Sequence, residues 1–237
     1  VDPVNDAPTI SNITDQSTNE GTAKTGIAFT VDEGGGADED AETLTVTATS
    51  SNTTLVPNAN IIVNYTDNGS SSASALSPTL DITPVGDFNG TTTITVTVTD
   101  NGTGNLTATD TFVLTVDPVN DAPIVVELSD TTVLEDGDFN RPLSSSDVDI
   151  ATNGQTLSYT VSSSNPDLVT VDTSNTDNQG GGQLDLDLQL NQNGSALITV
   201  IVSDSETPSM SDTTSFTLIV DPVNDAPTIS NITDQST

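Results

Sequence analysis

The sequence predicts an all-β protein made of two tandem immunoglobulin-like Greek-key β-sandwiches arranged end to end. The string VDPVNDAP occurs three times, at residues 1–8, 116–123 and 220–227. The segments between the copies alternate apolar residues with Thr and Ser, a period of two that is typical of half-buried strands. The apolar spacing of an amphipathic helix does not recur, so we expect no helix.

The three copies of the string divide the chain into repeated units, because a recurring segment indicates one structural unit used several times. Residues 1–18 and 220–237 are the same eighteen letters, so we expect the parent chain to continue with another copy of the first unit. The predicted organisation is a linker at 1–8, a module at 9–116, a linker at 117–123, a module at 124–220, and at 221–237 a linker with the start of the next repeat.

Each module contains about seven short apolar segments separated by clusters of Gly, Asn, Asp and Pro. In TITVTVTD, for example, Ile94, Val96 and Val98 face one side of a strand and the threonines face the other. About seven strands in ~105 residues is the pattern of an immunoglobulin-like sandwich. We expect strands near 9–14, 25–31, 43–49, 60–65, 74–83, 92–100 and 108–117, and near 124–134, 140–145, 156–163, 168–173, 183–190, 195–204 and 213–221.

The charge of the chain excludes several classes of partner. The chain has thirty-five acidic residues and two basic residues, Lys24 and Arg141, which gives a formal net charge of −33. Such a chain repels nucleic acid phosphates and anionic membrane surfaces. No apolar run approaches the ~20 residues that span a bilayer, so we expect no direct membrane insertion. Its natural small partners are cations.

The absence of two residue types argues against catalysis. The chain has no Cys and no His, which removes disulfides, thiolate chemistry and the commonest general base. No acidic pair stands among aromatic residues, and the chain has no Trp to line a sugar cleft. We therefore predict that the chain is not an enzyme. A secreted module without disulfides needs another source of stability, and a bound metal is one option.

The linker between the modules carries oxygen ligands on a stiff backbone. The two prolines of DPVNDAP restrict the backbone, and Asp117, Asn120 and Asp121 lie within five residues. Calcium takes six to eight oxygens from carboxylates, amides and carbonyls. The linker therefore predicts a Ca²⁺ site.

The string VNDAP resembles the linker of bacterial cadherin-like tandem repeats of large extracellular adhesins, and more distantly the D-x-N-D-N-A-P linker of cadherins. The sequence departs from that pattern because Pro118 and Val119 separate Asp117 from Asn120, and because Asp121 runs directly into Ala122. The resemblance implies cadherin-like β-sandwiches that hold Ca²⁺ between successive modules.

The resemblance also implies ligands at three junctions, one for each linker. The first junction would use Asp2, Asn5, Asp6, Asp38, Asp40 and Asp100, with Asp32, Asp38 and Asp40 remaining alternatives in the acidic loop. The middle junction would use Glu20, Asp117, Asn120, Asp121, Asp147, Asp149 and Asp204, with Asp87 as an additional candidate. The last junction would use Glu135, Asp221, Asn224 and Asp225, with Asp136 as an additional candidate.

These predictions lead to a function outside the cell. Extracellular calcium modules bind with dissociation constants near 10⁻⁴–10⁻³ M, so such sites would be empty in cytosol. We expect a calcium-rigidified spacer or stalk of a large cell-surface adhesin or fibre, whose partners are the adjacent repeats of the same chain. Two alternatives remain: a self-assembling extracellular filament in which neighbouring chains pair, and an adhesion module that binds a carbohydrate or a protein.

Overall fold

The computed structural model describes residues 4–35, 42–66 and 76–231. The chain divides into two compact units, Val1–Val119 and Asn120–Thr237. Almost all of the regular structure in both is β-strand. Within the described residues, no helix is long and apolar enough to cross a membrane.

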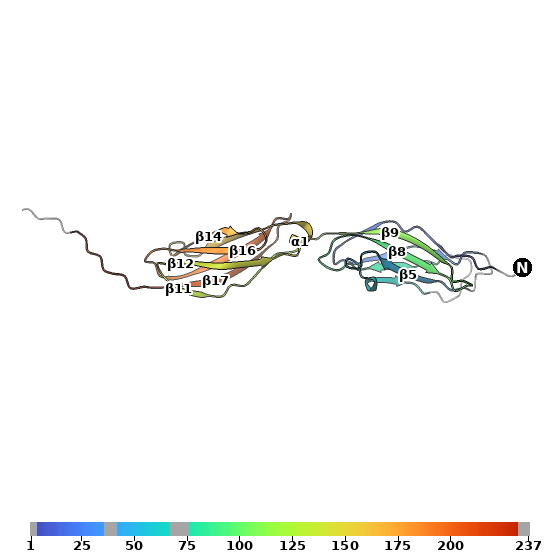
Figure 1. Cartoon of the computed structure of the whole chain (residues 1–237), viewed down its shortest axis with the longest axis horizontal. Helices are drawn as coiled ribbons and strands as arrows, with labels where there is room; N and C mark the ends of the chain where they lie inside the picture. The colour runs from blue at the N-terminus through green and yellow to red at the C-terminus, as the bar shows by residue number, and fades with distance from the viewer. Residues whose placement is uncertain (1–3, 36–41, 67–75, 232–237) are drawn as a thin grey trace, which may run out of the picture. The chain divides into compact units, whose positions relative to one another are not determined.

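The first unit is a sandwich of a four-stranded and a three-stranded sheet, with a short additional strand pair. The larger sheet has the order β2-β9-β8-β5, the smaller has β3-β7-β6, and β1 pairs with β4. The labels β9, β8 and β5 in Figure 1 mark neighbouring strands of the larger sheet. The elements are β1 Thr9–Ile10, β2 Gln16–Asn19, β3 Lys24–Ala28, β4 Val31–Asp32, β5 Thr45–Ser50, η1 Asn58–Asn60, β6 Ile61–Asn64, β7 Thr79–Ile82, β8 Gly90–Thr99 and β9 Thr107–Asp117.

The second unit repeats this plan with two four-stranded sheets. Their orders are β11-β17-β16-β13 and β10-β12-β15-β14. The elements are β10 Ile124–Val125, β11 Thr131–Leu134, β12 Asp138–Ser146, α1 Asp149–Asn153, β13 Leu157–Ser163, β14 Val169–Thr176, β15 Gly181–Leu188, β16 Gly194–Asp204 and β17 Ser211–Asp221.

The core of each unit follows the alternation predicted from the sequence. Ile94, Val96 and Val98 on β8 are fully buried, while the intervening threonines are partly or fully exposed. The equivalent residues of β16, Ile198, Val200 and Val202, are also fully buried. The two units have separate hydrophobic clusters, so each sandwich closes its own core.

The first segment of each module changes sheets partway along. The single strand predicted over 124–134 is wrong, because β10 pairs antiparallel with β12 and β11 pairs parallel with β17. Between these strands Asp130 accepts a hydrogen bond from the Thr217 amide at 2.7 Å, which occupies that amide before β11 begins. The predicted strand 9–14 is likewise replaced by β1 and β2, which join different sheets.

The prediction that no helix occurs is also wrong. The segment Asp149–Asn153 forms the one-turn helix α1, which ends at Gly154 with a φ of 72° in the left-handed region. A single turn cannot show amphipathic periodicity, so the sequence pattern had no means to reveal it. The predicted strand 74–83 lies partly outside the described residues, and its described part contains β7.

Candidate cation-binding ends of the two units

A buried glutamate closes the C-terminal end of each unit. Strand β2 runs parallel to β9 and β11 runs parallel to β17, so Glu20 and Glu135 follow directly after matching strands. Each is buried, at 8% and 6% exposure. Glu20 Oε1 accepts the Val119 amide at 2.6 Å, and Glu135 Oε1 accepts the Val223 amide at 2.7 Å. Both glutamates therefore fix the start of the linker that leaves their unit.

The glutamate of the second unit belongs to a group of three carboxylates. Glu135, Asp136 and Asp225 each present an oxygen, and these oxygens lie within 4.8 Å of one another. Glu135 Oε2 is buried and meets no hydrogen-bond donor among the described residues. A carboxylate normally accepts several hydrogen bonds, and a buried one without them is costly. A hard cation at this end would satisfy the free oxygen and offset the repulsion.

The N-terminal end of the second unit is organised around Asp204, which is 5% exposed at the end of β16. It accepts the amides of Glu206 at 3.1 Å and Met210 at 3.0 Å. Asn120 Nδ2 donates to Asp204 Oδ2 at 3.0 Å, and Asn120 Oδ1 is left buried without a donor from the described part of the chain. Asp204 thus positions the linker asparagine, whose oxygen remains available to a cation.

Asp147 and Asp149 stand on the turn that begins α1. Asp147 Oδ1 accepts the Asp149 amide at 2.9 Å, and Asp149 Oδ2 accepts the Asp121 amide at 2.9 Å. Asp149 is 1% exposed, and Asp147 Oδ2 is buried with no donor from the described ranges. Burial, and to a smaller extent the nearby charge of Asp149, raises the pKa of Asp147. At this turn, Asp147 Oδ2 remains without a donor among the described residues.

The first unit has a related N-terminal end. Asp100 is 3% exposed and accepts the amides of Gly102 at 3.1 Å and Leu106 at 3.0 Å. Asn5 Nδ2 lies 3.4 Å from both Asp100 oxygens, and Asn5 Oδ1 is buried without a donor in the residues that the structure describes. The Asn–Asp pair of the linker and the penultimate strand therefore occurs in both units.

The remaining predicted residues divide into three groups. Asp2, Asp38 and Asp40 lie outside the described residues. Asp32 is half-buried and accepts the Gly34 amide at 3.1 Å. The exposed residues are Asp6, Asp87, Asp117, Asp136, Asp221, Asn224 and Asp225. Of these exposed residues, Asp136 and Asp225 are brought together with Glu135.

Three residues that the sequence did not single out lie at the same ends. The pairing of Thr9 with Asp32 matches that of Ile124 with Ser146, which places Glu33 at the position of Asp147. Glu33 is 4% exposed, and its Oε1 is buried without a donor from the described residues. Gln155 is 3% exposed. Its counterpart is Glu42, because each lies two residues before the equivalent leucines Leu44 and Leu157. Glu42 is half-buried.

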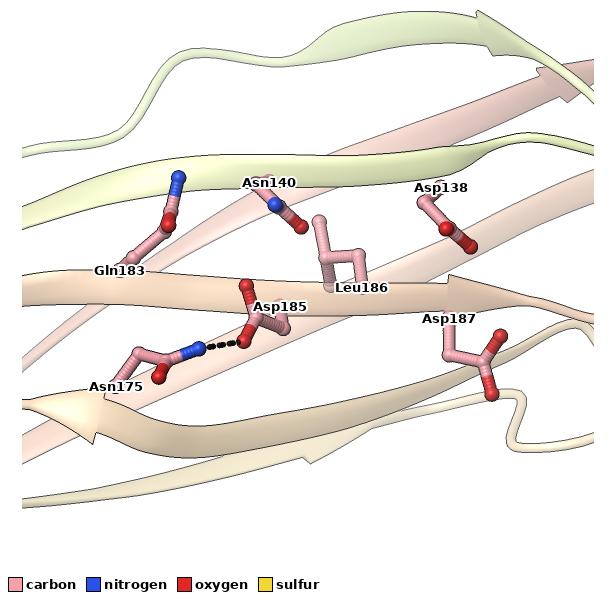
Figure 2. A pocket seen from close by; sticks show the side chains of 7 residues that line it. All are labelled: Asp138, Asn140, Asn175, Gln183, Asp185, Leu186 and Asp187. Atoms are coloured by element: carbon pink, nitrogen blue, oxygen red, sulfur yellow. Dashed lines mark hydrogen bonds between the residues drawn. The ribbon is translucent and has the colours of Figure 1, made fainter.

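A separate polar depression of about 330 Å³ lies on the outer face of the second unit, across β12, β15 and β14. Figure 2 shows the side chains that line it, which include Asp138, Asp185 and Asp187 together with the amides of Asn140, Asn175 and Gln183. Asn175 donates a hydrogen bond to Asp185, and Asp138 and Asp187 stand directly opposite each other. Its lining includes no aromatic residue that could stack on a sugar ring.

Comparison with known proteins shows which solved structures share this fold. No protein-family model matches the chain, and no curated protein matches it. Among solved structures, the extracellular cadherin domains 1–5 of protocadherin gamma B2 match 94% of the chain at 21% identity with a TM-score of 0.57. Domains EC1–3 of protocadherin gamma C5 match 92% at 18% identity, TM-score 0.54, and mouse cadherin-23 EC22–24 matches 92% at 17% identity, TM-score 0.53.

The chain is thus an all-β protein with the cadherin-like Greek-key sandwich fold. It spans 41% of the gamma B2 structure, and 69% and 68% of the other two. At these identities the similarity concerns the fold. The side chains at the ends of the units offer carboxylate and amide oxygens, which are the ligands that a hard cation such as Ca²⁺ prefers.

Proposed function

We propose that the chain is a calcium-rigidified spacer of a large extracellular adhesin or fibre, of the bacterial cadherin-like kind, and that it is not an enzyme. The proposal combines the cadherin-like fold with the carboxylate and amide oxygens that lie at the ends of the units. The observation that carries it is Glu135, a buried carboxylate with a free oxygen beside Asp136 and Asp225. In the first unit, the buried Glu20 likewise accepts the amide of the following linker.

Both units anchor the linker through a buried carboxylate. Glu20 holds the amide of Val119, and Asp149 holds the amide of Asp121. Successive Cα atoms are about 3.8 Å apart, so these two amides belong to one short stretch of backbone. In the proposed mechanism, the carboxylates that accept these amides would bind calcium, with Asn120 as a further ligand.

Repulsion between carboxylates gives calcium its role. Two unit charges about 4 Å apart repel by ~1 kcal/mol in water and more where they are partly buried. The chain has two basic residues, so it cannot neutralise these ends itself. With calcium bound the linker would become a fixed bridge; without it the carboxylates would favour separation. Millimolar calcium outside the cell suits sites of this kind.

The linker's stiffness can be measured by small-angle X-ray scattering on the whole chain. In millimolar calcium we expect one elongated species with a narrow distribution of particle lengths, and a broader distribution in chelator. The double variant Glu20→Gln and Asp149→Asn should behave in calcium as the native chain does in chelator. The matched control Asp187→Asn, on the outer face of β15, should respond to calcium like the native chain.

The outcomes separate the alternatives. Identical scattering with calcium and chelator would overturn the spacer mechanism. A calcium-dependent rise in apparent mass would favour the self-assembling filament instead. Binding to a carbohydrate or a partner protein without any change in scattering would favour the adhesion module.

A further inference from the structure

Gln155 lies on the N-terminal end of the second unit, between α1 and β13. It is 3% exposed, which is unusual for a glutamine because this residue type is mostly found on protein surfaces. Its Nε2 donates to Asp147 Oδ1 at 2.7 Å. The amide group therefore lies directly beside the carboxylate of Asp147.

The oxygen of this buried amide has no donor. Gln155 Oε1, Asp147 Oδ2 and Asn120 Oδ1 are all buried and lack hydrogen-bond donors from the described residues. A buried polar atom left unsatisfied costs about 1–3 kcal/mol. The hydrogen bond from the Gln155 amide nitrogen to Asp147 fixes the orientation of the amide, and its oxygen, which has no donor among the described residues, is open to an external group.

The counterpart position of the first unit faces a linker asparagine. A Cβ added to Gly102 would lie 2.0 Å from Asn5 Oδ1 and 2.2 Å from Glu42 Oε1, so these two oxygens lie close together. The residue two before Leu44 or Leu157 therefore presents an oxygen at the N-terminal end of either unit. It is a carboxylate in the first unit and an amide in the second.

We propose that Gln155 supplies a neutral oxygen ligand to the cation held by Asp147 and Asn120, and that this position sets the calcium affinity of each N-terminal end. This inference rests on the proposed function. Because affinity rises with the number of charged ligands, a carboxylate at this position, as at Glu42, should bind calcium more tightly than the amide of Gln155.

The test uses the whole chain and calcium itself. Gln155→Met removes the oxygen at nearly constant volume, Gln155→Glu adds the charge found at Glu42, and Gln183→Met on β15 is the matched control. Calcium titrations by calorimetry give the affinity, and melting in chelator gives the stability of the calcium-free protein. We expect Gln155→Met to weaken the affected site about tenfold and Gln155→Glu to strengthen it, with Gln183→Met unchanged.

A purely structural role would give a different result. If Gln155 only supports Asp147, Gln155→Met should lower the melting temperature equally in chelator and in calcium, and Gln155→Glu should not tighten binding. That result, or native affinity in Gln155→Met, would overturn the assignment of Gln155 while leaving calcium binding by the native chain intact. Absence of calcium binding by the native chain would overturn the proposed function as well.

Discussion

The N-terminal ends of the two units use the same framework but carry charge at different positions. Asn5 and Asn120 contact Asp100 and Asp204 in the same way, and each aspartate accepts the amide two residues later. Around this pair, Glu33 corresponds to Asp147 and Glu42 to Gln155. The hydrogen-bonded scaffold is thus repeated, while the charge that would meet a cation differs between neighbouring repeats.

Core truncations should produce the largest effect and show whether the units can be compared separately. Ile94 and Ile198 are fully buried at equivalent positions of β8 and β16. Ile94→Ala should destabilise the first unit, and Ile198→Ala the second, by about 2–5 kcal/mol each. Calorimetric melting should show one transition lowered in each variant and the other unchanged. If both transitions fall together, the two units unfold as one and the comparison fails.

Neutralising the buried glutamates tests whether both units bind calcium through them. Glu135→Gln keeps an oxygen that can accept the Val223 amide but removes one charge beside Asp136 and Asp225. We expect calcium affinity at that end to fall about tenfold, or ~1.4 kcal/mol. Glu20→Gln should have an effect of the same size at its own end. Calcium titration of both variants measures this, and wild-type affinity in either would remove that glutamate from the ligand set.

Arg141 stabilises the second unit and has no counterpart in the first. Its guanidinium lies 4.4 Å from the centre of the Phe216 ring and donates to the Ser129 carbonyl at 2.6 Å. Phe112 takes the place of Phe216 in the first unit, which has no arginine. Arg141→Met should lower the stability of the second unit by roughly 0.5–1 kcal/mol and leave the first unchanged. Urea unfolding of this variant beside Lys24→Met measures the difference; equal losses would contradict the assignment.

The smallest effect concerns acid stability of the first unit. Hydrogen bonds from the Gly26 amide and then from Asn64 lower the pKa of Asp81 below 3.8. A lowered pKa in the folded state adds stability above the unfolded value, and this is lost as pH falls below about 4. Asp81→Asn should therefore flatten the acid side of the stability profile of the first unit. Melting between pH 2.5 and pH 6 tests this, and an unchanged slope would contradict it.

The fold was predictable because the repeats and the alternation are strong signals. Ile94, Val96 and Val98 fall on the buried face as expected. What the pattern could not show was the change of sheet between β10 and β11, which depends on long-range pairing with β12 and β17. It also could not show the single turn α1, which is too short to repeat a period.

The candidate sites were only partly predictable for a related reason. Glu135, Asp147 and Asp204 stand beside a linker or at a strand end, where spacing in the sequence is informative. Glu33 was missed because its position follows from the register of β1 with β4, and the acidic loop of the first module offers several competing aspartates. Gln155 was missed because a neutral amide attracts attention only once its burial and its unsatisfied oxygen are known.

Melting of the whole chain with calcium and with chelator tests calcium stabilisation most directly, provided that ionic strength is matched with sodium chloride. A site at a calcium concentration about 100 times its dissociation constant adds about 2.7 kcal/mol. For units of this size we expect calcium to raise the melting temperatures by roughly 10 °C or more. Equal melting in calcium and in matched sodium chloride would contradict calcium binding at the ends of the units.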